Sequence, residues 1–229
     1  MKYLLFIIVS DLFFLNSFSQ TVASANAFGM NAYDISGKPL ASKGPAGGSP
    51  MLNSNWGKGL VKFTNGNWAS DVELQFNLRE NELYFRKNNQ SFSFVDSVQE
   101  FILAYEEEEV SYSVQYRSGY PSIGKNNSLQ FFEVVQDGSW LQLLKLTTKV
   151  LVERNNYGRG KEKEYRQSYE WYVFNVKKRK ISRIKKDKSS LQQALPDYSE
   201  QIKQLANEKG YKLRSEEEIA ELINLLNRQ

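Results

Sequence analysis

The chain contains neither cysteine nor histidine. Without cysteine it can form no disulfide bond, no thiolate nucleophile and no cysteine metal site. Without histidine it lacks the usual general base near neutral pH and the commonest ligand of zinc. These two absences exclude histidine-dependent serine hydrolases, cysteine proteases and ordinary zinc hydrolases. The sequence therefore predicts no cofactor, no metal site and no enzyme, although a hydrolase that works with carboxylates alone stays open.

Long apolar runs are also scarce, and the most apolar one lies at the start of the chain. Lys2 precedes the apolar stretch 3–15, which Asp11 interrupts, and small residues follow up to Ser19. A membrane span needs about 20 apolar residues, and an ionised group inside it is costly. A positive start, a short apolar centre and a small-residue site are typical of a cleavable secretory signal. We therefore predict a signal peptide at 1–19, export to the periplasm or the extracellular space, and no transmembrane segment after its removal.

The rest of the chain has enough apolar material for a packed core. Hydrophobic residues make up 41% of the sequence and aromatic residues 14%, and the net charge is +4. Such a composition argues against general disorder. Segment 20–50 is the exception, because it is rich in Ala, Ser, Gly and Asn and would bury little apolar area. We predict that it is a flexible leader.

Segment 51–186 alternates between apolar and polar residues, as in 72–78, which is typical of strands with one buried face. Asn65-Gly66, Asp137-Gly138 and the short connection 177–180 predict hairpins between antiparallel neighbours. The expected fold class is mainly β with a small α appendage. An antiparallel meander would form a barrel, a half-barrel or a strongly curved sheet, with C-terminal helices packed on it. Two polar inserts, 117–128 and 153–167, are predicted to be irregular loops.

Segment 187–229 changes to a helical period. Asp197 and Ser215 are each followed three residues later by glutamate, which predicts two helix starts, and Gly210 predicts the stop between them. The second helix should dock an apolar stripe onto the β domain, so that 187–229 forms a packed helical unit. The stripe consists of Ile219, Leu222, Ile223 and Leu226.

Two groups of residues are candidates for binding. The tryptophans could line a pocket for an apolar ligand, although strands also use aromatic residues simply for packing. Segment 177–188 is rich in lysine and arginine and could bind a polyanion or a membrane surface, unless its charges spread over a hairpin and a helix start. Nucleic acid is a less favoured partner, because no nucleic-acid motif accompanies the charge. The candidates are Trp56, Trp68, Trp140 and Trp171 for the pocket, and Lys177, Lys178, Arg179, Lys180, Arg183, Lys185 and Lys186 for the polyanion.

Acidic residues offer two further possibilities. The run 106–109 is more typical of a solvated turn than of a calcium site, because it lacks the spacing of a calcium loop. A glycosidase would need two carboxyl groups about 5 to 10 Å apart. Candidates for such a pair are Asp71, Glu73, Glu100 and Glu133.

As a set, these features resemble those of a loose group of exported, β-rich Gram-negative envelope proteins without assigned activity. The resemblance depends on the succession 48–52, on Trp56-Gly57-Lys58-Gly59, on the Asn65-Gly66 hairpin and on a Glu-rich terminal helix that ends near 225–227. It implies a location in the envelope or outside the cell and supplies no catalytic residue. The leading hypothesis is an exported, non-enzymatic binding or accessory protein of the cell envelope, which holds an apolar ligand or an envelope partner. The alternative is a polyanion or membrane-surface binder that acts through 177–188.

Overall fold

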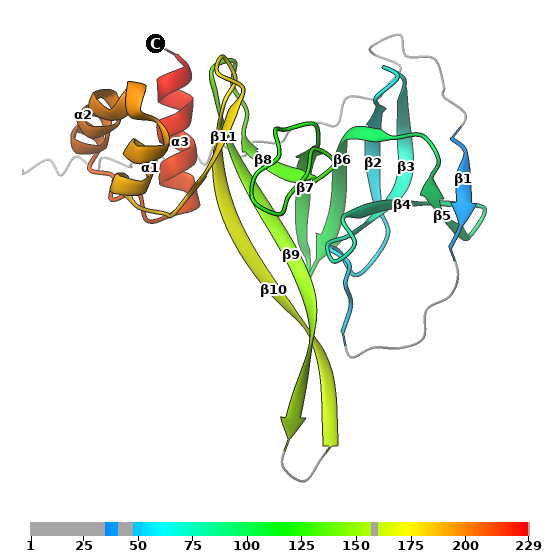
Figure 1. Cartoon of the computed structure of the whole chain (residues 1–229). Coiled ribbons are helices and arrows are strands. Elements are labelled where there is room, and N and C mark those ends of the chain that lie inside the picture. Colours follow the sequence, from blue (N-terminus) through cyan, green and yellow to red (C-terminus); the bar gives the residue numbers. More distant parts are fainter. Residues whose placement is uncertain (1–34, 41–47, 157–159, 229) are drawn as a thin grey trace, which may run out of the picture. The chain divides into compact units, whose positions relative to one another are not determined.

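The computed structural model describes residues 35–40, 48–156 and 160–228, without the side chains of 154–156 and 160–162. The expected signal peptide 1–19 and most of the expected leader lie outside these residues. The described chain forms one antiparallel sheet of eleven strands, in the order β1-β5-β4-β3-β2-β6-β7-β8-β9-β10-β11 (Figure 1). The strands are β1 (Gly37–Pro39), β2 (Gly57–Phe63), β3 (Trp68–Asn77), β4 (Glu82–Lys87), β5 (Gln90–Phe94), β6 (Val98–Glu107), β7 (Val110–Arg117), β8 (Phe132–Gln136), β9 (Leu141–Asn156), β10 (Gly160–Asn175) and β11 (Lys180–Ile184). The prediction of a mainly β, antiparallel fold is confirmed.

The sheet is open, with β1 and β11 at its two edges, and its N-terminal part must curl. Four strand spacings of about 4.8 Å separate β5 from β6 in the strand order, which is about 19 Å in a flat sheet. The connection 95–97 bridges at most about 15 Å, because each Cα–Cα step is about 3.8 Å. The rings of Phe63 on β2 and Phe94 on β5 lie 5.7 Å apart, and Figure 1 shows β4 crossing in front of β2 and β3. The strand order is therefore two meanders joined at the β2–β6 pair, and not one simple meander.

Strand β1 lies inside the segment for which a flexible leader was predicted. It pairs with β5, and Leu40 N donates to Ser91 O over 3.0 Å just beyond the pairing. Backbone hydrogen bonds at an open sheet edge can hold a segment with little apolar character. Composition alone does not reveal such pairing, so the leader prediction fails for residues 37–39.

The prediction of an irregular insert at 153–167 is wrong. Residues 141–156 and 160–175 form the two longest strands, β9 and β10, and they pair in register from Leu141–Asn175 to Asn156–Gly160. Beyond the part that pairs with β8 and β11, no other described strand pairs with this ribbon. Within 153–167 most of the described side chains are exposed, such as those of Lys163 and Arg166. A ribbon with two wet faces has no apolar alternation, and that alternation is the signal on which a strand prediction depends.

The hairpin predictions hold for chain direction and differ in turn geometry. Gly66 at the β2–β3 turn has a φ of 87°, and Arg179 at the β10–β11 turn has a φ of 47°. Strands β8 and β9 are antiparallel as expected, yet Gly138 between them does not adopt a positive φ. A Cβ atom at Gly138 would clash with the Asn227 side chain, so this glycine permits a close approach rather than a tight turn.

Three helices follow β11: α1 (Lys188–Ala194), α2 (Ser199–Lys209) and α3 (Glu216–Asn227). Gly210 ends α2 with a φ of 71°, and the Ser215 hydroxyl accepts a hydrogen bond from Glu218 N at the start of α3, as predicted. Asp197 does not cap α2, because it lies in the preceding 3₁₀ turn η2 (Pro196–Tyr198). Instead Asp187 caps α1 by accepting from Ser190 N over 2.7 Å.

Three apolar clusters hold the described structure together. The first lies among β2–β7, and the third lies on β8–β11 beneath the loop 118–131, where Tyr120 packs on Phe132. The second joins the helices to β9–β11 and contains the predicted stripe of α3, so the docking of this helix is confirmed. Among the described residues no helix has the length and apolar character that crossing a membrane requires.

Replacing Ile223 with aspartate should reduce the free energy of unfolding by several kcal/mol, because Ile223 is fully buried in the second cluster and the new carboxylate would have no cation partner there. Denaturation with urea measures the change. The matched control is Asn224→Asp, which adds the same charge one residue later at a half-exposed position. Equal stability of the two variants would contradict the docking of α3.

Candidate functional site

The four tryptophans do not meet in one pocket. Three of them contact cations in separate places, and Trp140 is 47% exposed at the start of β9. None of the four lines any of three cavities, of 310 to 660 Å³, that described residues form. The cation contacts are Lys62 over Trp68 at 5.2 Å, Arg86 over Trp56 at 5.3 Å and Lys186 over Trp171 at 4.3 Å.

The basic residues of 177–188 are divided between the two ends of β11. Lys177–Lys180 lie around the β10–β11 turn, whereas Lys185 and Lys186 follow the strand, about 16 Å away at 3.3 Å per residue. Several have partners: Lys178 pairs with Asp197, Arg183 with Glu170 at 2.8 Å, and Lys188 donates to Asn207 at 3.0 Å. Their charges therefore do not add up at one point.

Each carboxylate considered for a glycosidase pair contacts its own cation. The pairs are Asp71–Lys58 at 2.9 Å, Glu73–Arg86 at 2.6 Å, Glu100–Arg117 at 2.8 Å and Glu133–Lys145 at 3.0 Å. The hydrogen bond from Arg86 lowers the pKa of Glu73, which keeps that carboxyl ionised. A general acid needs a carboxyl that is protonated near neutral pH, so Glu73 is unsuited to that role. In the run 106–109, Glu106 and Glu107 end β6, and Glu108 and Glu109 form the β6–β7 turn with positive φ.

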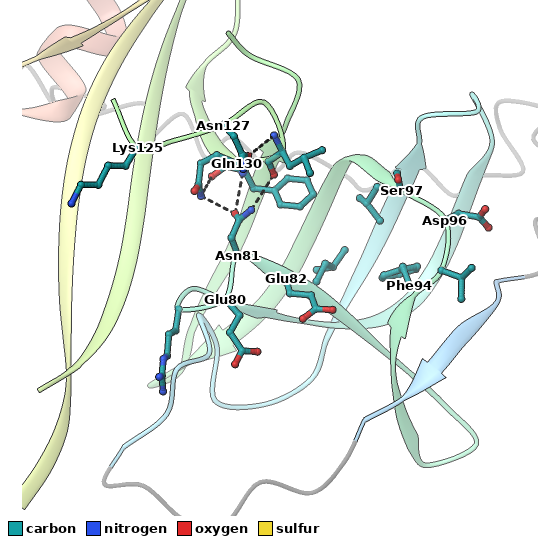
Figure 2. Close-up of a pocket in the computed structure, with 15 residues that line it drawn as sticks. Glu80, Asn81, Glu82, Phe94, Asp96, Ser97, Lys125, Asn127 and Gln130 are labelled. Atoms are coloured by element: carbon teal, nitrogen blue, oxygen red, sulfur yellow. Dashed lines mark hydrogen bonds between the residues drawn. The ribbon is translucent and has the colours of Figure 1, made fainter. Parts of the chain in front are cut away.

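The largest of the three cavities, about 660 Å³, lies where the β3–β4 turn, the β5–β6 connection and the loop 118–131 come together. We call it the acidic cleft, because Glu80, Glu82 and Asp96 line it. Figure 2 shows Glu80 and Glu82 extending from the β3–β4 turn, with Asp96 on the β5–β6 connection. The other lining residues are Arg79, Asn81, Leu83, Phe94, Val95, Ser97, Val98, Lys125, Asn127, Leu129, Gln130 and Phe131.

Asn81 fastens the loop to the β3–β4 turn. Its Oδ1 accepts hydrogen bonds from Gln130 Nε2 at 2.8 Å and from Phe131 N at 3.0 Å, and its Nδ2 donates to Leu129 O at 3.0 Å (Figure 2). Asn81 has a φ of 55°, a left-handed conformation that asparagine tolerates better than most residues. One side chain thus fixes both the turn and the wall of the cleft.

The carboxylates of the cleft converge on a buried tyrosine. Tyr84 Oη lies 2.9 Å from Glu80 Oε2 and 3.2 Å from Glu82 Oε2. Burial, together with the hydrogen bond to Glu80, raises the pKa of the Tyr84 hydroxyl, so it stays protonated and donates to a carboxylate. The turn itself is shaped by Asn77, whose Oδ1 accepts from Arg79 N and Glu80 N. Both acids are therefore placed by fixed groups rather than by free rotation.

Two exposed apolar residues border the same cleft. Val95 is 54% exposed and Leu129 is 69% exposed, and each lies next to polar lining groups. Beneath them, Leu83 and Phe131 are buried in the first cluster. These two side chains place apolar surface at the rim of a cavity that also carries charged and amide groups.

A largely, but not fully, buried ion cluster joins the sheet to α3 elsewhere. Lys145 Nζ lies 3.0 Å from Glu133 Oε1 and 3.2 Å from Glu216 Oε1, and Trp171 Nε1 donates to Glu216 Oε2 at 2.6 Å. Burial raises the pKa of Glu133 despite Lys145, whereas the two carboxylates outweigh the burial of Lys145 and raise its pKa. The described residues include no group of acidic side chains suited to a metal ion. The cluster therefore connects β8, β9 and β10 to α3 through ion pairs and a hydrogen bond.

Sequence reasoning missed the residues of the acidic cleft. The polar run 79–82 between two strand segments was the available signal, yet it is equally typical of a plain turn. The comparisons add no further guide, because no family model, no curated protein and no solved structure matches the chain.

Replacing Lys145 with methionine should cost up to about 3 kcal/mol of unfolding free energy at pH 8, because two largely buried carboxylates would lose their cation. A carboxyl whose folded pKa is raised stabilises the fold below its ordinary pKa and loses that contribution as the pH rises through the folded pKa. Removal of Lys145 raises the pKa of Glu133 further, so the cost should be smaller at pH 5. Denaturant unfolding at both pH values measures it, with the exposed Lys58→Met as control; a cost independent of pH would refute this account.

Proposed function

We propose that this chain is an exported, non-enzymatic binding protein of the cell envelope, and that the acidic cleft holds a partner protein through a segment with a basic and an aliphatic side chain. The observation that carries the proposal is the exposure of Val95 and Leu129 beside Glu80 and Glu82. Export is inferred from the sequence of residues 1–19.

The chemistry of the cleft favours a basic, partly apolar segment. A lysine or arginine of the partner would gain charge-assisted hydrogen bonds from the carboxylates, and an aliphatic neighbour would cover the exposed rim. Figure 2 shows Lys125 extending away from Glu80 and Glu82, so this lysine does not neutralise them. The cavity volume of about 660 Å³ is within the usual range for pockets that take a few side chains.

An apolar small molecule fits the structure less well. The interior of the curled β2–β7 part is filled by buried side chains such as Phe76, Phe101 and Tyr116, whose rings lie 4.9 to 5.2 Å apart. The largest of the three cavities is lined by eight residues with charged or amide groups beside six apolar ones. Burial of such groups against a purely apolar ligand would leave them without hydrogen-bond partners, which is unfavourable.

Short fluorescent peptides with Arg or Lys beside Leu or Ile should bind the mature protein in fluorescence anisotropy, whereas matched peptides with Glu in place of the cation should not. Glu82→Gln should weaken binding several-fold and reduce its salt dependence, because a charge-assisted hydrogen bond is lost. Val95→Ser should weaken binding several-fold without changing the salt dependence.

The controls for this test remove the same groups elsewhere. Glu109→Gln removes an exposed glutamate at the β6–β7 turn, and Val110→Ser truncates a valine that is 51% exposed, nearly the same as Val95. Neither residue lines the acidic cleft. Equal losses for the cleft variants and the control variants would exclude the cleft as the binding site.

The export part of the proposal has its own test. Expression of the full chain in a Gram-negative host should place the protein in the periplasmic or extracellular fraction, with an intact mass that begins at Gln20, because cleavage is predicted after Ser19. A variant with Leu4→Arg and Leu5→Arg should remain in the cytoplasm at full length, since the apolar centre of the signal is broken. Cytoplasmic accumulation of the unaltered chain would contradict export.

A further inference from the structure

A second cavity, of about 420 Å³, lies against the same loop and shares Lys125, but no other lining residue, with the acidic cleft. We call it the strand pocket, because strands β9, β10 and β11 form its floor. The loop closes it with a short turn in which Ile123 N and Asn126 N each donate to the other residue's carbonyl at 3.0 Å. The lining residues are Ile123, Gly124, Lys125, Asn126, Leu146, Thr148, Glu170, Tyr172 and Arg183.

The polar groups of the strand pocket hold one another in place. Glu170 Oε2 accepts from the Tyr172 hydroxyl at 2.5 Å, and its Oε1 accepts from Arg183 at 2.8 Å. Asn126 Nδ2 donates to Tyr172 Oη at 3.3 Å and so ties the loop to the floor. Burial and the hydrogen bond to Glu170 raise the pKa of Tyr172, which therefore remains neutral. Arg183 neutralises the charge of Glu170, and this ion pair orients the Arg183 guanidinium.

Once Glu170 and Arg183 are paired, Lys125 carries the one remaining charge among the residues that line the strand pocket. Lys125 belongs to the lining of the pocket, and Figure 2 shows its side chain extending from the loop toward β9 and β10. Among the described residues Lys125 has no hydrogen-bond or ion-pair partner. The Thr148 hydroxyl accompanies this charge on the floor, and it is hydrogen-bonded to the neighbouring Ser168 hydroxyl at 2.8 Å. The strand pocket thus combines a surplus cation with hydroxyl and amide groups.

We propose that the strand pocket binds a small, hydroxyl-rich carboxylate of the sugar-acid class. Lys125 and the free edge of the Arg183 guanidinium bind the carboxylate, and Thr148 and Asn126 bind the ligand hydroxyls. The volume is within the range of small-molecule sites. Such a ligand is either a free sugar acid or one unit of an acidic polysaccharide. The proposal does not depend on the acidic cleft or on its partner.

The test is isothermal titration calorimetry of the mature protein with galacturonate, galactose, inorganic phosphate and tri-galacturonate. Galacturonate should bind at least tenfold more tightly than galactose, because only the acid engages the cation. Tighter binding of the trimer than of the monomer identifies a polysaccharide as the source, and equal affinities identify a free sugar acid. Phosphate binding as tight as that of galacturonate would overturn the assignment to a sugar acid.

Variants locate the site. Lys125→Met should weaken galacturonate binding about tenfold and leave the melting temperature unchanged, because Lys125 is exposed and makes no contact that holds the fold. Thr148→Val should weaken both galacturonate and galactose. The matched control, Lys212→Met, removes an exposed lysine before α3 and should bind like the parent protein. Unchanged affinity of Lys125→Met, or no binding of galacturonate to the parent, would overturn the proposal.

Discussion

The arrangement of the C-terminal half depends on Lys145. Residues directly opposite one another on paired strands share a face, and the pairing places Tyr116, Glu133, Lys145 and Trp171 in one row across β7–β10. Glu216 on α3 contacts this row by pairing with Lys145 and by accepting a hydrogen bond from Trp171 Nε1. Apolar burial in the second cluster supplies most of the free energy of docking. The ion cluster around Lys145 adds a positional constraint, because a shift of α3 by one turn would leave largely buried charges unpaired.

The loop 118–131, which lines both cavities, is also held in position by side chains of other elements. Strand β8 has five residues and makes few ladder contacts with β7, so the loop that precedes it is not held by the sheet alone. Side chains hold it: Asn81 binds one end, Tyr120 Oη donates to Gln142 Oε1 at 3.0 Å, and Asn126 binds Tyr172. The partners of Tyr120 and Asn126 lie on β9 and β10, which pair with each other along sixteen residues and contact Glu216 of α3 through Lys145 and Trp171. Both cavities therefore depend on the same two strands.

Much of the fold could be predicted from the sequence, and the failures have physical reasons. The α3 stripe and the Ser215 cap are local signals, since residues three and four apart share a helix face, and they appear in the structure as expected. Only the far part of the β9–β10 ribbon, within 153–167, could not be recognised, because exposed faces carry no apolar period. Strand β1 depends on pairing with β5, and the Gly138 contact depends on Asn227, which is 89 positions later. Long-range contacts of this kind leave no local signal.

The candidate sites were harder to predict than the fold, for a related reason. Tryptophans and a lysine-rich run are conspicuous in a sequence. In the structure three of the tryptophans contact cations in separate places, and Asp197 and Glu170 compensate charges of the lysine-rich run. The two cavities are instead lined by common residue types, such as Glu82 and Lys125. Such residues do not stand out in a sequence, because their charge becomes available only through the positions of their neighbours in the fold.

Fixing such groups before a ligand arrives reduces the conformational entropy that binding must overcome. In the loop, Gly119 N donates to Ser128 O at 2.7 Å and Leu129 N donates to Asn127 Oδ1 at 2.9 Å, so its backbone is ordered without help from a ligand. A preformed loop of this kind can present an acidic cavity on one side and a basic pocket on the other, because neither set of charges has to move to be used.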